Sequence, residues 1–112
     1  MNKYGAKKTV IEGLKFDSKH EAMRYVELKY AERTGAITDL RTQVAFELIP
    51  SQKGKDGKVA ERAVRYIADF TYTDENGNFV VEDAKSKATR TDVYRIKRKL
   101  MLFMKGIEVK EV

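Results

Sequence analysis

The sequence of 112 residues has no cysteine, a single histidine and no long run of apolar residues. Without cysteine, the chain cannot form a disulfide framework, a zinc ribbon or a thiol nucleophile. The histidine, His20, falls where we expect the first turn of a helix, so a histidine-based mechanism has little support. The longest apolar run, Leu100–Met104, is too short for a transmembrane helix. The basic N-terminus is not followed by an apolar stretch, so we expect no secretory signal, no membrane partner and a cytoplasmic location.

The length and composition fit one folded domain over residues 1–112, with residues 1–8 as a basic N-terminal arm. Hydrophobic residues make up 42% of the chain, which is enough for a packed core. Lys and Arg number 23 against 17 Asp and Glu, a net charge of +6. This balance favours a polyanionic partner without establishing one.

A hairpin and then a helix are predicted at the start of the domain. Thr9–Phe16 contains two short apolar-rich runs separated by a turn. Ser18 and Glu21 have the spacing of a capping box, so we expect a helix over residues 18–34. Glu21 begins the face of this helix that also carries Tyr25, the face expected to look toward a sheet.

Three strands are predicted in the middle of the chain, at Ile37–Ile49, Val59–Thr73 and Phe79–Lys85. Ser51–Gly57 is rich in Lys and Gly and predicts a turn or loop. Asp74–Gly77 joins the last two strands, and its Asn-Gly pair predicts a type I′ hairpin turn.

A second helix and a final strand complete the prediction. Thr89 or Thr91 can cap the helix, which runs to about Met104 and ends at Gly106. Ile107–Val112 alternates and predicts a strand. The order indicates an α/β or α+β fold, a mixed β-sheet flanked by helices with an N-terminal β-hairpin. The second helix is expected to pack through its apolar stripe, Val93, Ile96, Leu100 and Phe103.

The two predicted strands around the Asn-Gly turn carry an unusual polar cluster. Asp69 lies inside an apolar strand, where an unpaired carboxylate is disfavoured. Asp83 and Lys85 are two residues apart and share a face, and the turn brings Asp69 near Asp83. Without a chemical role, these residues would be explained by ion pairs, for example Asp69 with Arg65 or Arg62.

Two carboxylates and one ammonium on a single face suit metal-assisted hydrolysis. Carboxylate oxygens bind hard cations such as Mg²⁺, with Mn²⁺ as the alternative ion. The metal polarises a phosphoryl oxygen and lowers the pKa of a bound water. A neighbouring lysine can orient or deprotonate that water, or stabilise charge on phosphate. The cluster therefore predicts a site for phosphodiester hydrolysis.

Asp69, followed after thirteen residues by Asp83-Ala84-Lys85, resembles the D…(D/E)-x-K signature of the restriction-endonuclease-like PD-(D/E)XK nuclease superfamily. Phe16–Glu21 resembles the start of that superfamily's first helix. Ile37–Pro50 looks like the strand that follows this helix in transposase-end-cleaving and mismatch-repair members. From Lys3 to Val112, the chain is similar to a family of short phage and prophage proteins of unknown function assigned to this superfamily.

The resemblance implies a restriction-endonuclease-like fold and a role for each motif residue. Glu21, Asp69 and Asp83 would hold the metal, Lys85 would activate the water or stabilise the transition state, and Gln43 would lie near the site.

The chain departs from the superfamily's pattern at two positions. Ala68, not proline, precedes Asp69, and the second acid is Asp83 rather than the commoner Glu. A β-bulge would exchange Asp83 for the adjacent Glu82, which we otherwise expect to be solvated on the opposite face. Glu21 also has a purely structural alternative as the acid of the capping box.

Most of the excess positive charge follows the D-x-K lysine. Residues 84–105 carry eight basic residues and one acid, a charge of +7. Charge of one sign beside an acidic metal site suits binding to a phosphate backbone, and the alternative is a solvated helix face. With Gln43, the residues expected to contact nucleic acid are Lys87, Arg90, Arg95, Lys97 and Arg98.

The sequence thus predicts a small Mg²⁺-dependent DNA endonuclease in a bacterial host. A chain of this length leaves little room for base readout, so cleavage of branched recombination intermediates fits better than sequence-specific cleavage. We expect a homodimer, because one such site cuts one strand. A phage recombination or packaging protein is a further expected partner. The alternative is a non-catalytic nucleic-acid-binding or accessory protein with the same fold.

Overall fold

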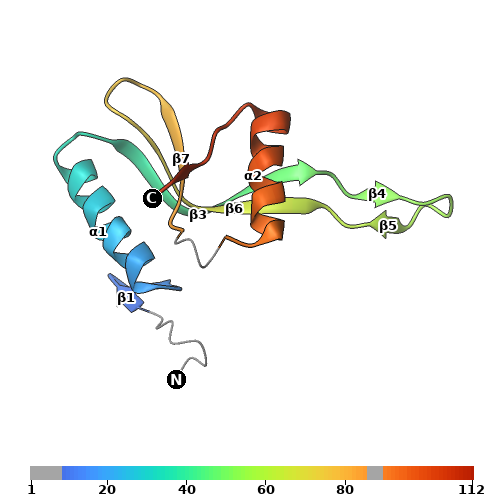
Figure 1. The fold of residues 1–112 in the computed structure, drawn as a ribbon, viewed down its shortest axis with the longest axis horizontal. Helices are drawn as coiled ribbons and strands as arrows, with labels where there is room; N and C mark the ends of the chain where they lie inside the picture. Colours follow the sequence, from blue (N-terminus) through green and yellow to red (C-terminus); the bar gives the residue numbers. More distant parts are fainter. Residues whose placement is uncertain (1–8, 86–89) are drawn as a thin grey trace.

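The computed structural model describes residues 9–85 and 90–112. The predicted basic arm, residues 1–8, and the predicted DNA contact Lys87 lie outside the described residues. The described part is a mixed α+β fold, as the sequence predicted, in which two helices pack against a mixed sheet (Figure 1). Neither helix combines the length and the apolar character that a bilayer crossing requires.

The described residues form two helices and eight strands, joined by turns and loops. In chain order they are β1 (Thr9–Ile11), β2 (Leu14–Phe16), α1 (Lys19–Arg33), β3 (Thr38–Ile49), β4 (Gln52–Lys53), β5 (Val59–Glu61), β6 (Val64–Thr73), β7 (Phe79–Asp83), α2 (Asp92–Lys105) and β8 (Lys110–Glu111).

The predicted N-terminal hairpin and first helix are confirmed. β1 and β2 pair antiparallel, and Ser18 is the N-cap of α1, where its Oγ accepts the backbone N–H of Glu21 at 3.1 Å. This cap satisfies one of the orphan donors of the first turn. The helix packs toward the sheet through its buried residues, Glu21, Ala22, Tyr25 and Leu28.

The main sheet has the strand order β3-β6-β7-β8. β3, β6 and β7 are antiparallel neighbours, whereas β8 joins β7 in parallel. β7 ends at Asp83, two residues earlier than predicted. The predicted final strand, residues 107–112, is reduced to Lys110–Glu111, because only those residues pair with β7.

The turn between β6 and β7 is in the predicted place, but the type I′ prediction is wrong. Gly77 has a φ of +82°, whereas Asn76 does not have the positive φ that a type I′ turn requires. Asp74 closes the turn instead, because its Oδ1 accepts the backbone N–H groups of Asn76 and Asn78, both at 2.9 Å.

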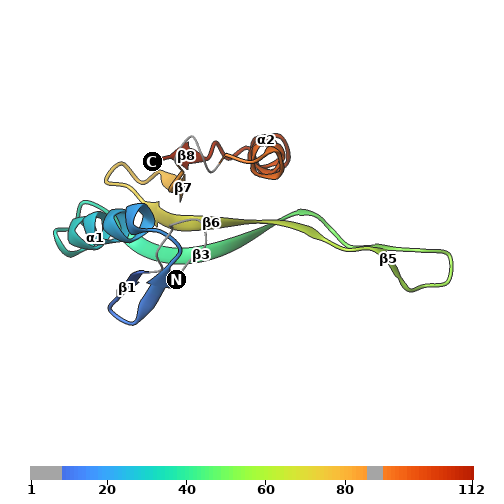
Figure 2. The same cartoon turned by 60° about the horizontal axis from the view of Figure 1, so that its bottom comes forward.

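A projecting ribbon replaces the loop predicted for Ser51–Gly57. β4 pairs antiparallel with β5, and the strand predicted over residues 59–73 is interrupted at residues 62–63. We call residues 50–63 the β4–β5 ribbon. It continues the β3–β6 pair away from both helices, so that the molecule measures 53 × 41 × 26 Å (Figures 1 and 2). Alternating short strands around a Gly-rich turn thus pair here without a core beneath them.

The second helix buries a different face from the predicted one. Tyr94 and Met101 are its buried residues, whereas Val93, Ile96 and Phe103 are 61%, 58% and 84% exposed. α2 carries two neighbouring apolar stripes, and contacts with the sheet select the one that holds Tyr94. The cluster beneath α2 comprises Leu48, Tyr66, Ala68, Val81, Tyr94, Met101 and Val109.

Candidate functional site

Asp69 and Asp83 lie side by side on adjacent strands. β6 and β7 pair with Phe70 opposite Glu82, which sets Asp69 beside the end of β7. There the backbone N–H of Ala84 donates to Asp69 Oδ2 at 2.8 Å. Burial raises the pKa of Asp69 to about 6, and the nearby Asp83 carboxylate adds to this effect while the Ala84 N–H opposes it. Two carboxylates that repel each other in this way favour the arrival of a cation.

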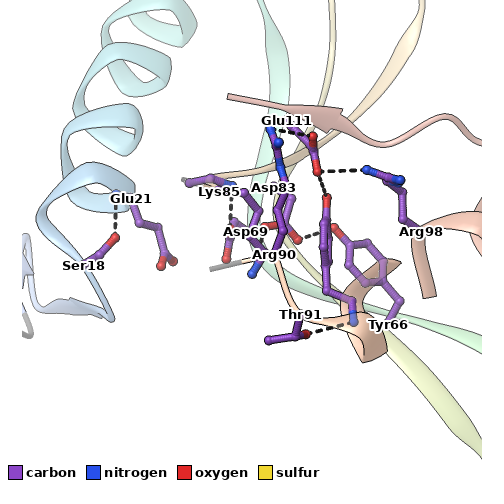
Figure 3. Close-up of polar contacts among 12 residues, drawn as sticks. Ser18, Glu21, Tyr66, Asp69, Asp83, Lys85, Arg90, Thr91, Arg98 and Glu111 are labelled. Carbon is purple, nitrogen blue, oxygen red and sulfur yellow. Dashed lines mark hydrogen bonds and ion pairs between the residues drawn. The ribbon is translucent and has the colours of Figure 1, made fainter. Parts of the chain in front are cut away.

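Asp83 is held between an ammonium and a phenol (Figure 3). Its side chain is buried; the Tyr66 hydroxyl donates to Oδ2 at 2.6 Å, and Lys85 Nζ lies 3.3 Å from Oδ1. Oδ1 has no aligned hydrogen-bond donor within residues 9–85 and 90–112. Lys85 Nζ also lies 4.8 Å from the centre of the Tyr94 ring. These contacts fix the carboxylate and the ammonium relative to each other.

Sequence reasoning missed Tyr66 as part of this site. Strict alternation along the strand assigns Tyr66 and Asp69 to opposite faces. Only the position of Asp83 relative to the long tyrosine side chain shows that the hydroxyl reaches it. The available signal was weak: a tyrosine on a buried strand face usually needs a partner for its hydroxyl.

The neighbouring acid, Glu82, has a different environment. It is fully buried, and Arg24 donates to its two oxygens at 2.8 and 2.7 Å from Nε and Nη2. The Tyr72 hydroxyl donates to the same carboxylate. The prediction that Glu82 is solvated is therefore wrong, because α1 supplies a buried partner for it. The acid beside Lys85 is Asp83.

Glu21 and Gln43 approach the site from α1 and β3. Gln43 Nε2 donates to Glu21 Oε1 at 3.1 Å and lies 3.5 Å from Asp69 Oδ1. Gln43 has a φ of +53° in the middle of β3. Burial, and then the charges of Asp69 and Asp17, raise the pKa of Glu21 to about 7. The capping role and the proximity to Asp69 are thus combined in one residue, whose backbone serves the cap and whose side chain extends toward Asp69 (Figure 3).

The carboxylates fit a metal held by two groups better than a closed three-carboxylate cage. Within the described ranges, 9–85 and 90–112, no three His, Cys, Asp or Glu side chains are arranged to hold one metal ion. Asp69 and Asp83 nevertheless supply the hard oxygen donors that Mg²⁺ prefers, and Asp83 Oδ1 is buried without an aligned donor. Mg²⁺ commonly uses one or two carboxylates and completes its shell with water and substrate oxygens.

A hollow of about 260 Å³ opens beside Asp83. Three basic side chains line it, Arg65 from β6, Lys85 after β7 and Lys97 from α2, against the single carboxylate of Asp83. Its remaining lining residues are Tyr66, Ile67, Thr91, Val93 and Tyr94. The excess of cations gives this hollow the charge that a phosphate group requires.

The three arginines among the predicted DNA contacts are ion-paired. Arg90 and Arg98 both contact Glu111, at 3.0 and 3.3 Å, and Arg95 contacts Asp92 at 3.1 Å. The structure thus brings Lys97 to the site and ties three arginines of the basic segment to carboxylates of the chain itself.

One family model, described as a protein of unknown function (DUF1064), matches residues 1–111. The chain matches no curated protein and no solved structure.

Proposed function

We propose that this chain, which belongs to the DUF1064 family of proteins of unknown function, is a metal-dependent DNA endonuclease of the restriction-endonuclease-like, PD-(D/E)XK type. One observation carries the proposal. Asp69 and Asp83 lie together on adjacent strands, and Lys85 is held 3.3 Å from Asp83 at the edge of a cationic hollow. A carboxyl group with a raised pKa, here Asp69, near a positioned lysine is typical of catalytic sites.

Asp69 and Asp83 would hold Mg²⁺ or Mn²⁺, with Glu21 as a third acid linked through Gln43. The ion would lower the pKa of a bound water and polarise a phosphoryl oxygen. Asp83 is oriented for this task by the Tyr66 hydroxyl.

Lys85 would act on the phosphodiester itself. Its ammonium is partly shielded from solvent and lies beside Asp83 at the hollow. From there it can stabilise the negative charge that develops on phosphate or orient the attacking water. Arg65 and Lys97 would bind a phosphate oxygen of the same DNA strand in the hollow. Their positive charge supports a substrate that contains phosphate.

The experiment is a cleavage panel of linear, nicked, flapped, forked and four-way DNA, with Mg²⁺, Mn²⁺ or EDTA. We expect metal-dependent cleavage that favours branched DNA. Lys85→Ala should lower the cleavage rate by about 100-fold or more, while DNA affinity stays within a few fold. The matched control is Lys99→Ala, which removes an exposed lysine that does not line the hollow. Cleavage by Lys85→Ala at the wild-type rate would disprove this role for the lysine.

A homodimer belongs to this proposal, because a single site of this kind cuts one strand. Sedimentation of the protein alone and on a four-way junction would measure the number of copies. Two symmetric nicks from a monomer on the junction would contradict the dimer.

A non-catalytic DNA-binding or accessory protein with the same fold is the second candidate. It is favoured by the lack of three metal-ligating groups around one point within the described residues. Calorimetric titration separates the two candidates. If the protein binds neither Mg²⁺ nor Mn²⁺, whether DNA is present or absent, the result would support the second candidate and contradict the nuclease.

A further inference from the structure

We propose that the β4–β5 ribbon enters the major groove of duplex DNA whose backbone lies at the candidate site. This inference rests on the proposed function in taking DNA as the ligand, and it adds a second, separate DNA-contacting element. It also goes against the expectation that so short a chain leaves little room for base readout.

The shape of the ribbon is the first support. It extends beyond the paired residues Ile49 and Val64, and every residue of β4 and β5 is exposed. Six residues from Ile49 to the tip span about 20 Å in extended conformation. The major groove is about 12 Å wide and admits a two-stranded ribbon. Figures 1 and 2 both show the ribbon clear of the helices, so nothing in the described chain covers it.

The charge of the ribbon is the second support. Its basic residues are Lys53, Lys55, Lys58 and Arg62, with Arg65 at its base, against the acids Asp56 and Glu61. None of these five basic side chains forms an ion pair within residues 9–85 and 90–112, whereas Arg90, Arg95 and Arg98 are ion-paired. The ribbon and its base thus present five basic side chains without an ion-pair partner among the described residues.

The tip of the ribbon is a closed turn. The N–H of Gly54 donates to the carbonyl of Lys58 at 2.8 Å, and that of Gly57 to the carbonyl of Gly54 at 3.0 Å. Asp56 Oδ1 accepts the N–H of Lys58 at 3.0 Å, so this acid is used inside the turn. The lysines therefore project from an internally bonded tip, which lowers the entropy that binding would cost.

Continuity with the candidate site is the third support. Arg65 lines the hollow beside Asp83, and together with Arg62 it also lines a second hollow, of about 480 Å³, at the base of the ribbon. Basic side chains thus lead from the proposed active site to the ribbon. A DNA strand that has one phosphate near Lys85 would continue past Arg65 and Arg62 toward the ribbon.

Duplex DNA fits the ribbon better than a second copy of the chain does. Each edge of a two-stranded ribbon can pair with another strand, but lysines on edge strands discourage such pairing. Two copies would also bring like-charged ribbons together, whereas a polyanion neutralises them.

The test is a salt titration of duplex affinity in EDTA, where cleavage cannot occur. The variant is Lys53→Gln/Lys55→Gln/Lys58→Gln. We expect its plot of log affinity against log salt to be flatter than that of the wild type by roughly 2 to 3 units, at about 0.9 unit per lost phosphate contact. The matched control is Lys15→Gln/Lys105→Gln/Lys110→Gln, which removes three exposed lysines elsewhere and should change the slope by less than one unit.

A second measurement addresses the groove. Guanine N7 faces the major groove, so methylation by dimethyl sulfate reports its occupancy. We expect the wild type to protect guanines beside the cleavage point and the ribbon variant to lose this protection. The inference is overturned if the ribbon variant keeps the wild-type slope and protection, or if only its self-association changes.

Failure of the two proposals can be told apart. A ribbon-dependent slope without metal-dependent cleavage would leave the ribbon inference standing and remove the nuclease. Metal-dependent cleavage together with a salt slope that does not depend on the ribbon would leave the nuclease proposal standing and remove the ribbon inference.

Discussion

Glu82 and Asp83 show how two consecutive acids acquire opposite roles. Glu82 points toward α1 and pairs with Arg24 of that helix, and the Tyr72 hydroxyl of β6 donates to the same carboxylate, while Asp83 points toward Lys85 and Tyr66. One acid therefore ties the first helix to the sheet, and the other remains beside a lysine. Consecutive residues of a strand point to opposite faces, so Glu82 lies on the face that packs against α1 and Asp83 lies on the face of the candidate site.

Removal of the Arg24 side chain should strongly destabilise the fold. Arg24→Ala leaves Glu82 buried without its charged partner, and such losses cost about 3–5 kcal/mol. Urea unfolding followed by circular dichroism would measure the change. Arg41→Ala, which breaks an exposed ion pair with Asp39, should cost less than about 1 kcal/mol. Equal effects of the two substitutions would show that the Glu82 pair is not buried.

The carboxylates of Glu21 and Asp69 should make stability fall as the pH rises. Their pKa values, about 7 and about 6, lie above the ordinary 4.5 and 3.8, so the folded chain binds protons more tightly than the unfolded chain does. The stability that this provides is present below about pH 4 and is lost as the pH rises through 6 to 7.

Urea midpoints in metal-free buffer at pH 5 and pH 8 test this dependence. The midpoint should be lower at pH 8, and Glu21→Gln should reduce the difference, whereas Glu75→Gln, at an exposed turn, should not. A midpoint that rises over this range in the wild type, and equally in Glu21→Gln, would contradict the coupling of the two acids.

At the scale of elements, the orientation of α2 determines what the site contains. Rotation of the helix toward Tyr94 and Met101 places Lys97 at the hollow and leaves Val93 and Ile96 exposed. The Tyr94 hydroxyl then donates to Glu111 of β8 at 2.7 Å.

Two alanine substitutions test this orientation. Met101→Ala should cost about 2–5 kcal/mol, because it empties a fully buried position. Ile96→Ala should change the free energy of unfolding by no more than about 0.5 kcal/mol, as expected for an exposed side chain. Chemical denaturation of both variants gives the comparison, and the opposite ranking would mean that α2 packs through its other face.

At the scale of the whole molecule, the ribbon makes the protein elongated. The radius of gyration is 16.3 Å, against about 13 Å for a compact domain of this length. The two core clusters lie between the sheet and the helices, and no residue of β4 or β5 is buried. The ribbon therefore contributes little buried surface to the core.

Excision of the ribbon should leave the core intact. Ile49 and Val64 are paired, so Asn-Gly in place of residues 50–63 would close a two-residue hairpin. The free energy of unfolding should change by less than about 1 kcal/mol, since no buried residue is lost. Thermal and urea unfolding would measure it, with small-angle scattering to show the smaller radius. Loss of cooperative unfolding would show that the ribbon supports the core.

Much of this architecture was determined by local sequence. The capping box at Ser18, the alternation in β6 and the Gly77 turn specify neighbouring elements, because caps, pleat and turns depend on residues a few positions apart. These local rules predicted α1, the β6–β7 hairpin and the proximity of Asp69 and Asp83.

Tertiary structure alone decided the rest. The Arg24 partner of Glu82, the reach of Tyr66 to Asp83 and the rotation of α2 are contacts between residues far apart in sequence. The β4–β5 pairing is closer in sequence, yet Lys and Gly around its tip favoured a loop over strands. A local pattern states which faces are apolar or charged, but not which surface each will meet. That choice depends on how the whole chain packs, because burial and ion pairing are satisfied only when every element is in place.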